Sequence, residues 1–351
     1  MDFKIIRSFL ALFFFTTAVF LSSQQPVRAQ SAPAGIEMQA QPGFEGNFKY
    51  GEWLPIWVTL ENTGADVEAT LQAQINQSGG NITFATRVSL PYSSRKQIVL
   101  YVLPNNFSRE IEIQLISEDT LLASQVVEVS PIQNDHYMIG ITAPEWGPLS
   151  QISSIQFDRT PREIVLSDLD LSKIPDQPAG LNSFDVIILN DTDTSTLSEA
   201  QQQSLENWVK NGGFLVIGGG AGIEKTVAGL PDSLVNFEFQ DLIETSDLQS
   251  LERLGGGEEI MLEGPFLISA VVEDGQFSGS NDPEIVHQWP LGKGTVSLVS
   301  LSLTDAPFNA WSGTPEFWKT LLANDAFYPT WLARDLSERQ MRSNGMSYPL
   351  S

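Results

Sequence analysis

Apolar and polar side chains alternate through the first third of the chain. Between Ile36 and Ile132 this period of two recurs in short runs, which stop at turns such as Asn62-Thr63-Gly64 and Gly79-Gly80. Alternation of this kind is typical of strands that bury one face. About seven such strands with turns between them predict an antiparallel β-sandwich of immunoglobulin-like type over residues 36–132.

The periodicity changes after the polar joint at Pro131–Asp135. Val186–Leu189 and Phe214–Ile217 are short apolar runs of the kind found in strands covered on both faces. Between them, Ser198 and Gln201 form a capping-box signal at the start of an amphipathic helix. Strands that alternate with helices predict a parallel sheet built from right-handed βαβ units.

Two stretches carry resemblances to known families. The stretch WLPIWVTLENTGADVEATLQAQI, residues 53–75, resembles the opening hairpin of Ig-like adhesion and cell-envelope modules in exported bacterial proteins. The stretch FDVIILNDTDTSTLSEAQQQSLENWVKNGGFLVIGGG, supported by PLGKGTVSLVSLSLTDAPFNAW further on, resembles the class I glutamine amidotransferase-like fold. This flavodoxin-like sheet, also used by ThuA-like proteins, is expected over residues 135–328. The fold class implied is an Ig-like β-sandwich followed by a parallel-sheet α/β domain.

The second resemblance does not imply glutaminase chemistry. In active amidotransferases the turn after a central strand carries a cysteine nucleophile, with a histidine later in the chain. This chain has no cysteine, and the corresponding turn, Gly218–Gly222, contains no nucleophile. The resemblance therefore implies a catalytically silent member.

The N-terminal residues have the pattern of a secretory signal. Lys4 and Arg7 precede the apolar run Phe9–Leu21, and Val27 and Ala29 fit the positions that signal peptidase reads. We expect residues 1–29 to be a cleaved signal peptide and residues 30–35 to be a linker. The alternative is a retained membrane anchor, although the apolar run is short for a span. Residues 329–351 form a polar C-terminal tail without periodicity.

Composition excludes several functions. The net charge of −24 repels phosphate backbones and anionic lipids, so we expect no nucleic-acid partner and no membrane contact except through the signal segment or a partner. The absence of cysteine excludes disulfides and thiolate metal sites. His136 and His287 are the only histidines, and neither accompanies a G-x-S-x-G motif, so a structural or surface position is favoured for both.

Acidic residues follow several predicted strands. Ligands of open α/β sheets bind beyond the carboxyl ends of strands. The candidate ligand-binding residues on this face are Glu145, Asp191, Asp193, Gly219, Gly220 and Asp305. Asp191 and Asp193 could hold Ca²⁺ or Mg²⁺ through carboxylate oxygens, and no other cofactor is expected. Alternatively, the acids cap helices or are solvated, and the glycines form a tight turn that allows close packing.

A candidate interaction patch lies at the start of one predicted strand. Trp53 and Trp57 point to the face opposite Leu54 and Ile56, and Tyr50 lies close by in the sequence. If this face is open, the three rings suit contact with a protein or a glycan. If a second layer covers it, they belong to the core.

These observations favour an exported, non-enzymatic binding or scaffolding protein of the cell envelope, with an envelope protein or glycan as its partner. The alternative is a ThuA-like hydrolase or carbohydrate-active enzyme that uses the carboxylates at the strand ends. In an enzyme these acids should converge in one pocket, whereas in a binding protein they should spread over a solvated rim.

Overall fold

A computed structural model describes residues 35–77, 80–157, 163–273, 276–277 and 284–323. The predicted signal peptide, most of the linker and the C-terminal tail lie outside these residues. Among the described residues, no helix is both long and apolar enough to cross a membrane.

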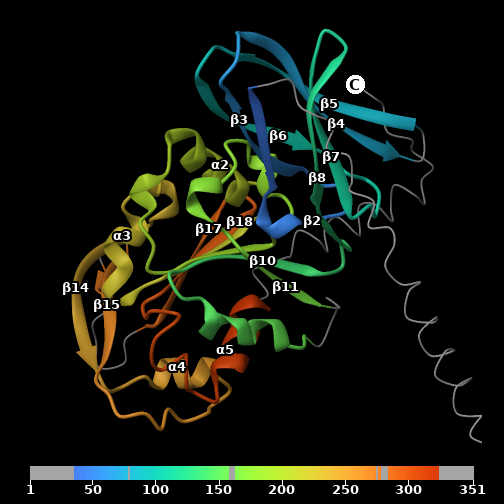
Figure 1. Ribbon diagram of the computed structural model, residues 1–351. Helices are drawn as coiled ribbons and strands as arrows, with labels where there is room; N and C mark the ends of the chain where they lie inside the picture. Colours follow the sequence, from blue (N-terminus) through green and yellow to red (C-terminus); the bar gives the residue numbers. More distant parts are fainter. Residues whose placement is uncertain (1–34, 78–79, 158–162, 274–275, 278–283, 324–351) are drawn as a thin grey trace, which may run out of the picture.

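The N-terminal domain is an antiparallel β-sandwich, as the period-two pattern predicts (Figure 1). One sheet has the strand order β1-β3-β6, and the other has the order β5-β4-β7-β8. The strands are β1 (Ile36–Pro42), β3 (Leu54–Asn62), β4 (Val67–Gln77), β5 (Gly80–Leu90), β6 (Ser94–Val102), β7 (Glu110–Ser117) and β8 (Thr120–Glu128). Two short parallel strands, β2 (Asn47–Lys49) and β9 (Ser130–Ile132), lie at the junction with the second domain.

The second domain contains a six-stranded sheet with the order β11-β10-β12-β13-β18-β17. Its first five strands pair in parallel, and β17 joins the edge antiparallel to β18. In chain order the parallel strands read 2-1-3-4-5, which is the flavodoxin-like order. The strands are β10 (Tyr137–Thr142), β11 (Ile164–Asp168), β12 (Val186–Leu189), β13 (Phe214–Gly218), β17 (Val286–Leu291) and β18 (Gly294–Val299).

Helices cover both faces of this sheet. The helix α2 (Glu199–Lys210) begins with the predicted capping box between Ser198 and Gln201, and it buries Leu205 and Trp208 against one face. The opposite face packs against η2 (Gly147–Ser154) and α5 (Thr314–Leu322). The other α-helices of the described residues are α3 (Ile223–Val227) and α4 (Gln249–Leu254), and short 3-10 turns fill several connections.

A separate small sheet has the order β14-β15-β16. It consists of β14 (Glu238–Thr245), β15 (Phe266–Glu273) and β16 (Gln276–Phe277), all antiparallel. Strands β14 and β15 lie on the side of the α/β domain away from the sandwich (Figure 1). The apolar run at Phe266–Val272 therefore forms a strand of this sheet rather than of the parallel sheet.

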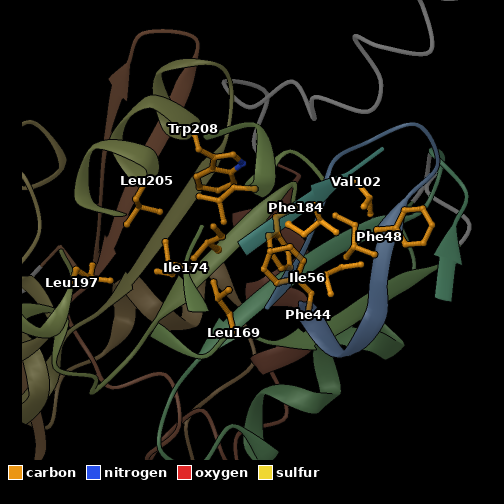
Figure 2. Packing of buried hydrophobic residues seen from close by; sticks show 14 of the residues in the cluster. Phe44, Phe48, Ile56, Val102, Leu169, Ile174, Phe184, Leu197, Leu205 and Trp208 are labelled. Carbon is orange, nitrogen blue, oxygen red and sulfur yellow. The ribbon is translucent and has the colours of Figure 1, made fainter. Parts of the chain in front are cut away.

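One apolar cluster runs from the sandwich into the α/β domain (Figure 2). Phe44, from the loop between β1 and β2, contacts Phe184 edge to face, with ring centroids 4.6 Å apart. Phe184 in turn lies over Gly140 in β10, where an added Cβ would come within 2.9 Å of the phenylalanine ring. Glycine at position 140 therefore allows the domain interface to close onto the sheet.

Buried polar groups join the same two domains. The Lys49 ammonium pairs with the Asp185 carboxylate, and both side chains are almost completely excluded from solvent. The same Asp185 oxygen, Oδ2, accepts a hydrogen bond of 2.8 Å from the backbone N–H of Met138. The Lys49 backbone N–H donates to Ser183 Oγ at 3.1 Å. These contacts fix β2 against the start of β12.

Candidate functional site

The side chain of Asn190, the residue directly after β12, makes hydrogen bonds to the segment that follows β18. This buried residue accepts a hydrogen bond from the Leu303 backbone N–H at 2.8 Å and donates one to Thr304 Oγ1 at 3.1 Å. A Cβ at position 218 would lie 2.0 Å from Asn190 Oδ1, so only glycine at the end of β13 leaves room for this amide. Asn190 therefore holds the segment after β18 against the carboxyl ends of β12 and β13.

The glycine-rich turn after β13 directs its backbone donors inward. The Gly219 N–H is shared between the carbonyl oxygens of Val299 and Leu301, at 2.7 and 3.0 Å, and the Gly220 N–H donates to Ser300 at 3.1 Å. These N–H groups are satisfied within the fold, whereas a phosphate cradle or an oxyanion site requires donors that point at the ligand. The structure shows the tight turn, and ligand binding by Gly219 and Gly220 stays a prediction.

The small sheet covers this turn. The Ser269 backbone N–H, in β15, donates to the Ser300 carbonyl at 2.8 Å, and Ser269 Oγ contacts the Gly220 carbonyl at 3.3 Å. Ser269 is itself buried. The carboxyl ends of β13 and β18 thus pack against another part of the same chain.

Asp191 and Asp193, the two acids predicted as cation ligands, interact with other side chains and backbone groups of the chain. Asp191 pairs with the Lys225 ammonium at 2.9 Å. Asp193 accepts hydrogen bonds from the Ser195 hydroxyl and backbone N–H, at 2.5 and 3.0 Å, and caps a short 3-10 turn. These two hydrogen bonds stabilise the carboxylate and lower the pKa of Asp193, the hydroxyl bond having the larger effect. Asp193 therefore has the capping role that was the alternative to metal binding.

Glu145 and Asp305 are exposed in the loops after β10 and β18. Within the described ranges, no group of three or more histidine, aspartate or glutamate residues is positioned to hold a metal ion. The four predicted acids accordingly do not form a shared cation cluster. Glu145, Asp193 and Asp305 are exposed, and Asp191 is partly buried.

One histidine lies beside acidic residues at the domain joint, and the other is buried in a strand. His136 lies between the carboxylates of Asp135 and Glu163, at 3.8 and 3.6 Å, beside the domain joint. His287 is buried within β17, where it is paired with Leu298 of β18. Both placements agree with the structural or surface position expected from the sequence.

Of the three aromatic residues predicted as an interaction patch, Trp57 belongs to the core. Its side chain is only 5% exposed and packs near Phe44, with ring centroids 6.5 Å apart. The loop between β1 and β2 supplies this cover, because Gly43 approaches the indole too closely to tolerate a Cβ. At Trp57 the structure therefore has the second alternative, in which the ring is covered and belongs to the core, so Trp57 is not part of an exposed patch.

Tyr50 and Trp53 are partly exposed, and each has an aromatic neighbour that the sequence analysis did not single out. Tyr50 stacks on Phe107 with ring centroids 4.9 Å apart and an interplanar angle of 18°. Trp53 contacts Phe84 of β5 edge to face at 5.7 Å. Phe107 is 61% exposed. We call these four residues, Tyr50, Trp53, Phe84 and Phe107, the aromatic end of the sandwich.

Backbone hydrogen bonds hold the loop that presents Tyr50 and Trp53. The Tyr50 N–H donates to the Ile132 carbonyl at 3.0 Å, and the Gly51 N–H donates to the Pro104 carbonyl at 3.1 Å. Gly51 adopts a φ of 77°, which glycine reaches without a Cβ clash. Lys49, directly before Tyr50, is buried and pairs with Asp185 of the α/β domain, so this pair also holds the start of the loop in place.

Residues 35–130 match the model of a family described as a domain of unknown function, DUF8726. This match coincides with the β-sandwich. Among curated proteins, none matches the sequence.

Two solved structures resemble parts of the chain. A CARDB domain of the PF1109 protein from Pyrococcus furiosus, solved in complex with di-metal ions, is 16% identical. The match covers 28% of this chain and 93% of that domain, with a TM-score of 0.24. A calcium-binding mutant of Bacteroides uniformis β-glucuronidase 2 is 12% identical over 52% of this chain and 23% of the glucuronidase, with a TM-score of 0.20.

The DUF8726 domain thus carries the aromatic end, and the α/β domain carries the closed strand ends. A cavity of about 1060 Å³ also opens in the α/β domain between β17, α4 and α5. Side chains of both charges line it, including Arg253, Glu284 and Lys319. None of the acids predicted from the strand ends is among its lining residues.

Proposed function

We propose that the protein is an exported, non-catalytic binding or scaffolding component of the bacterial cell envelope, and that the aromatic end of the DUF8726 domain is its binding surface. The observation that carries this proposal is the stack of the exposed Phe107 on Tyr50, whose loop is anchored by backbone hydrogen bonds. Exposed aromatic rings on a rigid base gain contact area at low entropic cost, and such groups often dominate binding. Export is supported by the signal-like pattern of residues 1–29.

The α/β domain would be a silent relative of the class I glutamine amidotransferase-like proteins. Support comes from its flavodoxin-like strand order and from the glycine-rich turn after β13. Acyl transfer requires a nucleophile, a base and free oxyanion donors in one place. The turn has no nucleophilic side chain, and the N–H groups of Gly219 and Gly220 donate to carbonyls of the same chain.

A ThuA-like hydrolase is the less supported alternative. Hydrolysis by carboxylates needs two acids placed on either side of the scissile bond, with their pKa values set apart by different surroundings. Here the pairing of Asp191 with Lys225 and the capping role of Asp193 favour structural roles for these carboxylates. These contacts make a binding function the better supported proposal.

Capture of partners from intact envelopes tests this proposal. After chemical cross-linking in cells, Phe107→Ala should lose at least about 80% of the envelope material captured by the parent protein, because the exposed ring supplies most of the contact. The matched control is Tyr92→Ala, which removes a ring that is 69% exposed in the turn after β5. Equal loss in both variants, or retention by Phe107→Ala, would contradict the proposed surface.

A further inference from the structure

Two of the four rings at the aromatic end, Phe84 and Phe107, lie in stretches without charge in a strongly acidic protein. The chain has 43 acidic and 19 basic residues, yet residues 69–86 and residues 97–108 contain no charged side chain. The first stretch supplies most of β4 and the first half of β5, which pair with each other, and the second ends in the loop that carries Phe107. Charge is therefore sparse on these strands, and the charged residues near the rings in the sequence include Glu52, between Tyr50 and Trp53, and Arg109, after Ser108.

Several asparagine residues lie next to Phe107 in its loop or at the adjoining turn of the β4–β5 hairpin. Asn106, next to Phe107, donates from Nδ2 to the backbone carbonyl of Asn76 in β4, and its Oδ1 accepts from the Ser108 N–H at 3.0 Å. Asn76 pairs in register with Asn81 of β5, and Asn105 is exposed in the same loop as Phe107. Amides provide both hydrogen-bond donors and acceptors without a charge.

We infer that the aromatic end binds a neutral polysaccharide built from hexopyranose units. This inference rests on the proposed function and names the partner of that same surface. A pyranose ring has an apolar C–H face that can lie on an aromatic ring, and a rim of hydroxyl groups that pair with amides. A site that combines apolar area with a few uncharged polar groups matches such a ligand in both respects.

Other partners fit the surface less well. Anionic lipid or nucleic acid would be repelled by the net charge of −24 and would find no cluster of basic residues in these stretches. The central residues of a protein–protein interface often include arginine as well as aromatic residues, and arginine is absent from both uncharged stretches. The observed combination of rings and amides favours sugar hydroxyl groups over either alternative.

Affinity electrophoresis of the purified full chain tests the inference. Native gels would contain mannan, dextran, hydroxyethyl cellulose or the neutral polysaccharide fraction of the source envelope. At least one of these should retard the parent and Tyr92→Ala equally. Phe107→Ala should weaken the apparent affinity by about tenfold, which corresponds to about 1.4 kcal/mol. Both exposed substitutions should leave the fold intact, which circular dichroism would verify.

Three outcomes would overturn the inference: no retardation of the parent in any gel, equal retardation of Phe107→Ala, or Phe107-dependent binding to vesicles of phosphatidylcholine instead. If partner capture from envelopes still depends on Phe107 while every gel is negative, the glycan inference fails and the proposed binding function stands. If that capture is also independent of Phe107, the proposed function fails with it.

Discussion

Replacing Lys49 with methionine should lower the free energy of unfolding by about 3–5 kcal/mol, because the change leaves the Asp185 carboxylate buried without its ammonium partner. Methionine keeps most of the length of the lysine side chain, so cavity formation contributes little. Equilibrium unfolding in urea, with the protein at constant concentration, measures the change. A loss below about 1 kcal/mol would mean that the pair is solvated and contributes little to the interface.

The double variant Lys49→Met with Asp185→Asn provides the control. Asparagine removes the charge and retains an oxygen that can accept from the Met138 N–H, as Asp185 Oδ2 does. Most of the stability lost in the single variant should therefore return. If the double variant is as unstable as the single one, lost packing rather than the unpaired charge is the cause.

Replacing Phe184 with alanine should cost a similar amount, about 3–5 kcal/mol, because a fully buried ring is removed from the interface between the domains. The ring contacts Phe44 of the sandwich and lies over Gly140 of the parallel sheet. Since one apolar cluster spans both domains, circular dichroism and tryptophan fluorescence should report a single transition that shifts as a whole.

Phe107→Ala is the matched control for this loss, since it removes the same ring from an exposed position and should change stability by less than about 0.5 kcal/mol. Separate transitions of the two domains, with only one of them affected by Phe184→Ala, would contradict the shared core.

The repeating local patterns were sufficient to predict the fold class. Period-two alternation in Leu54–Leu60 identified β3, and the capping box at Ser198 identified the start of α2. Both signals depend on neighbouring residues, so they can be read along the chain. The small sheet was missed because β14 is largely exposed and has a weak apolar pattern. Its partner β15 is recognisable as an apolar run, although its pairing depends on residues far apart in the sequence.

The candidate site was predicted less completely, because contacts between distant segments decide it. Nothing local to Trp57 indicates that the Phe44 loop covers it, and nothing local to Gly219 indicates that carbonyls after β18 accept its N–H. Lys49 follows Asn47 and Phe48 in an ordinary polar and apolar alternation, yet its partner Asp185 lies 136 positions away. Phe107 could have been noticed as an aromatic residue in the uncharged loop LPNNFS.

The central claim is that the protein acts by binding through the sandwich and not by chemistry at the strand ends. Photo-cross-linking in living cells tests it most directly, with the reactive residue placed in turn at Phe107, at Tyr92 and at Asp305. The three positions report the aromatic end, an exposed control site and the strand-end rim. We predict a discrete adduct from position 107 and none from positions 92 and 305. A discrete adduct from position 305, with none from position 107, would contradict the account.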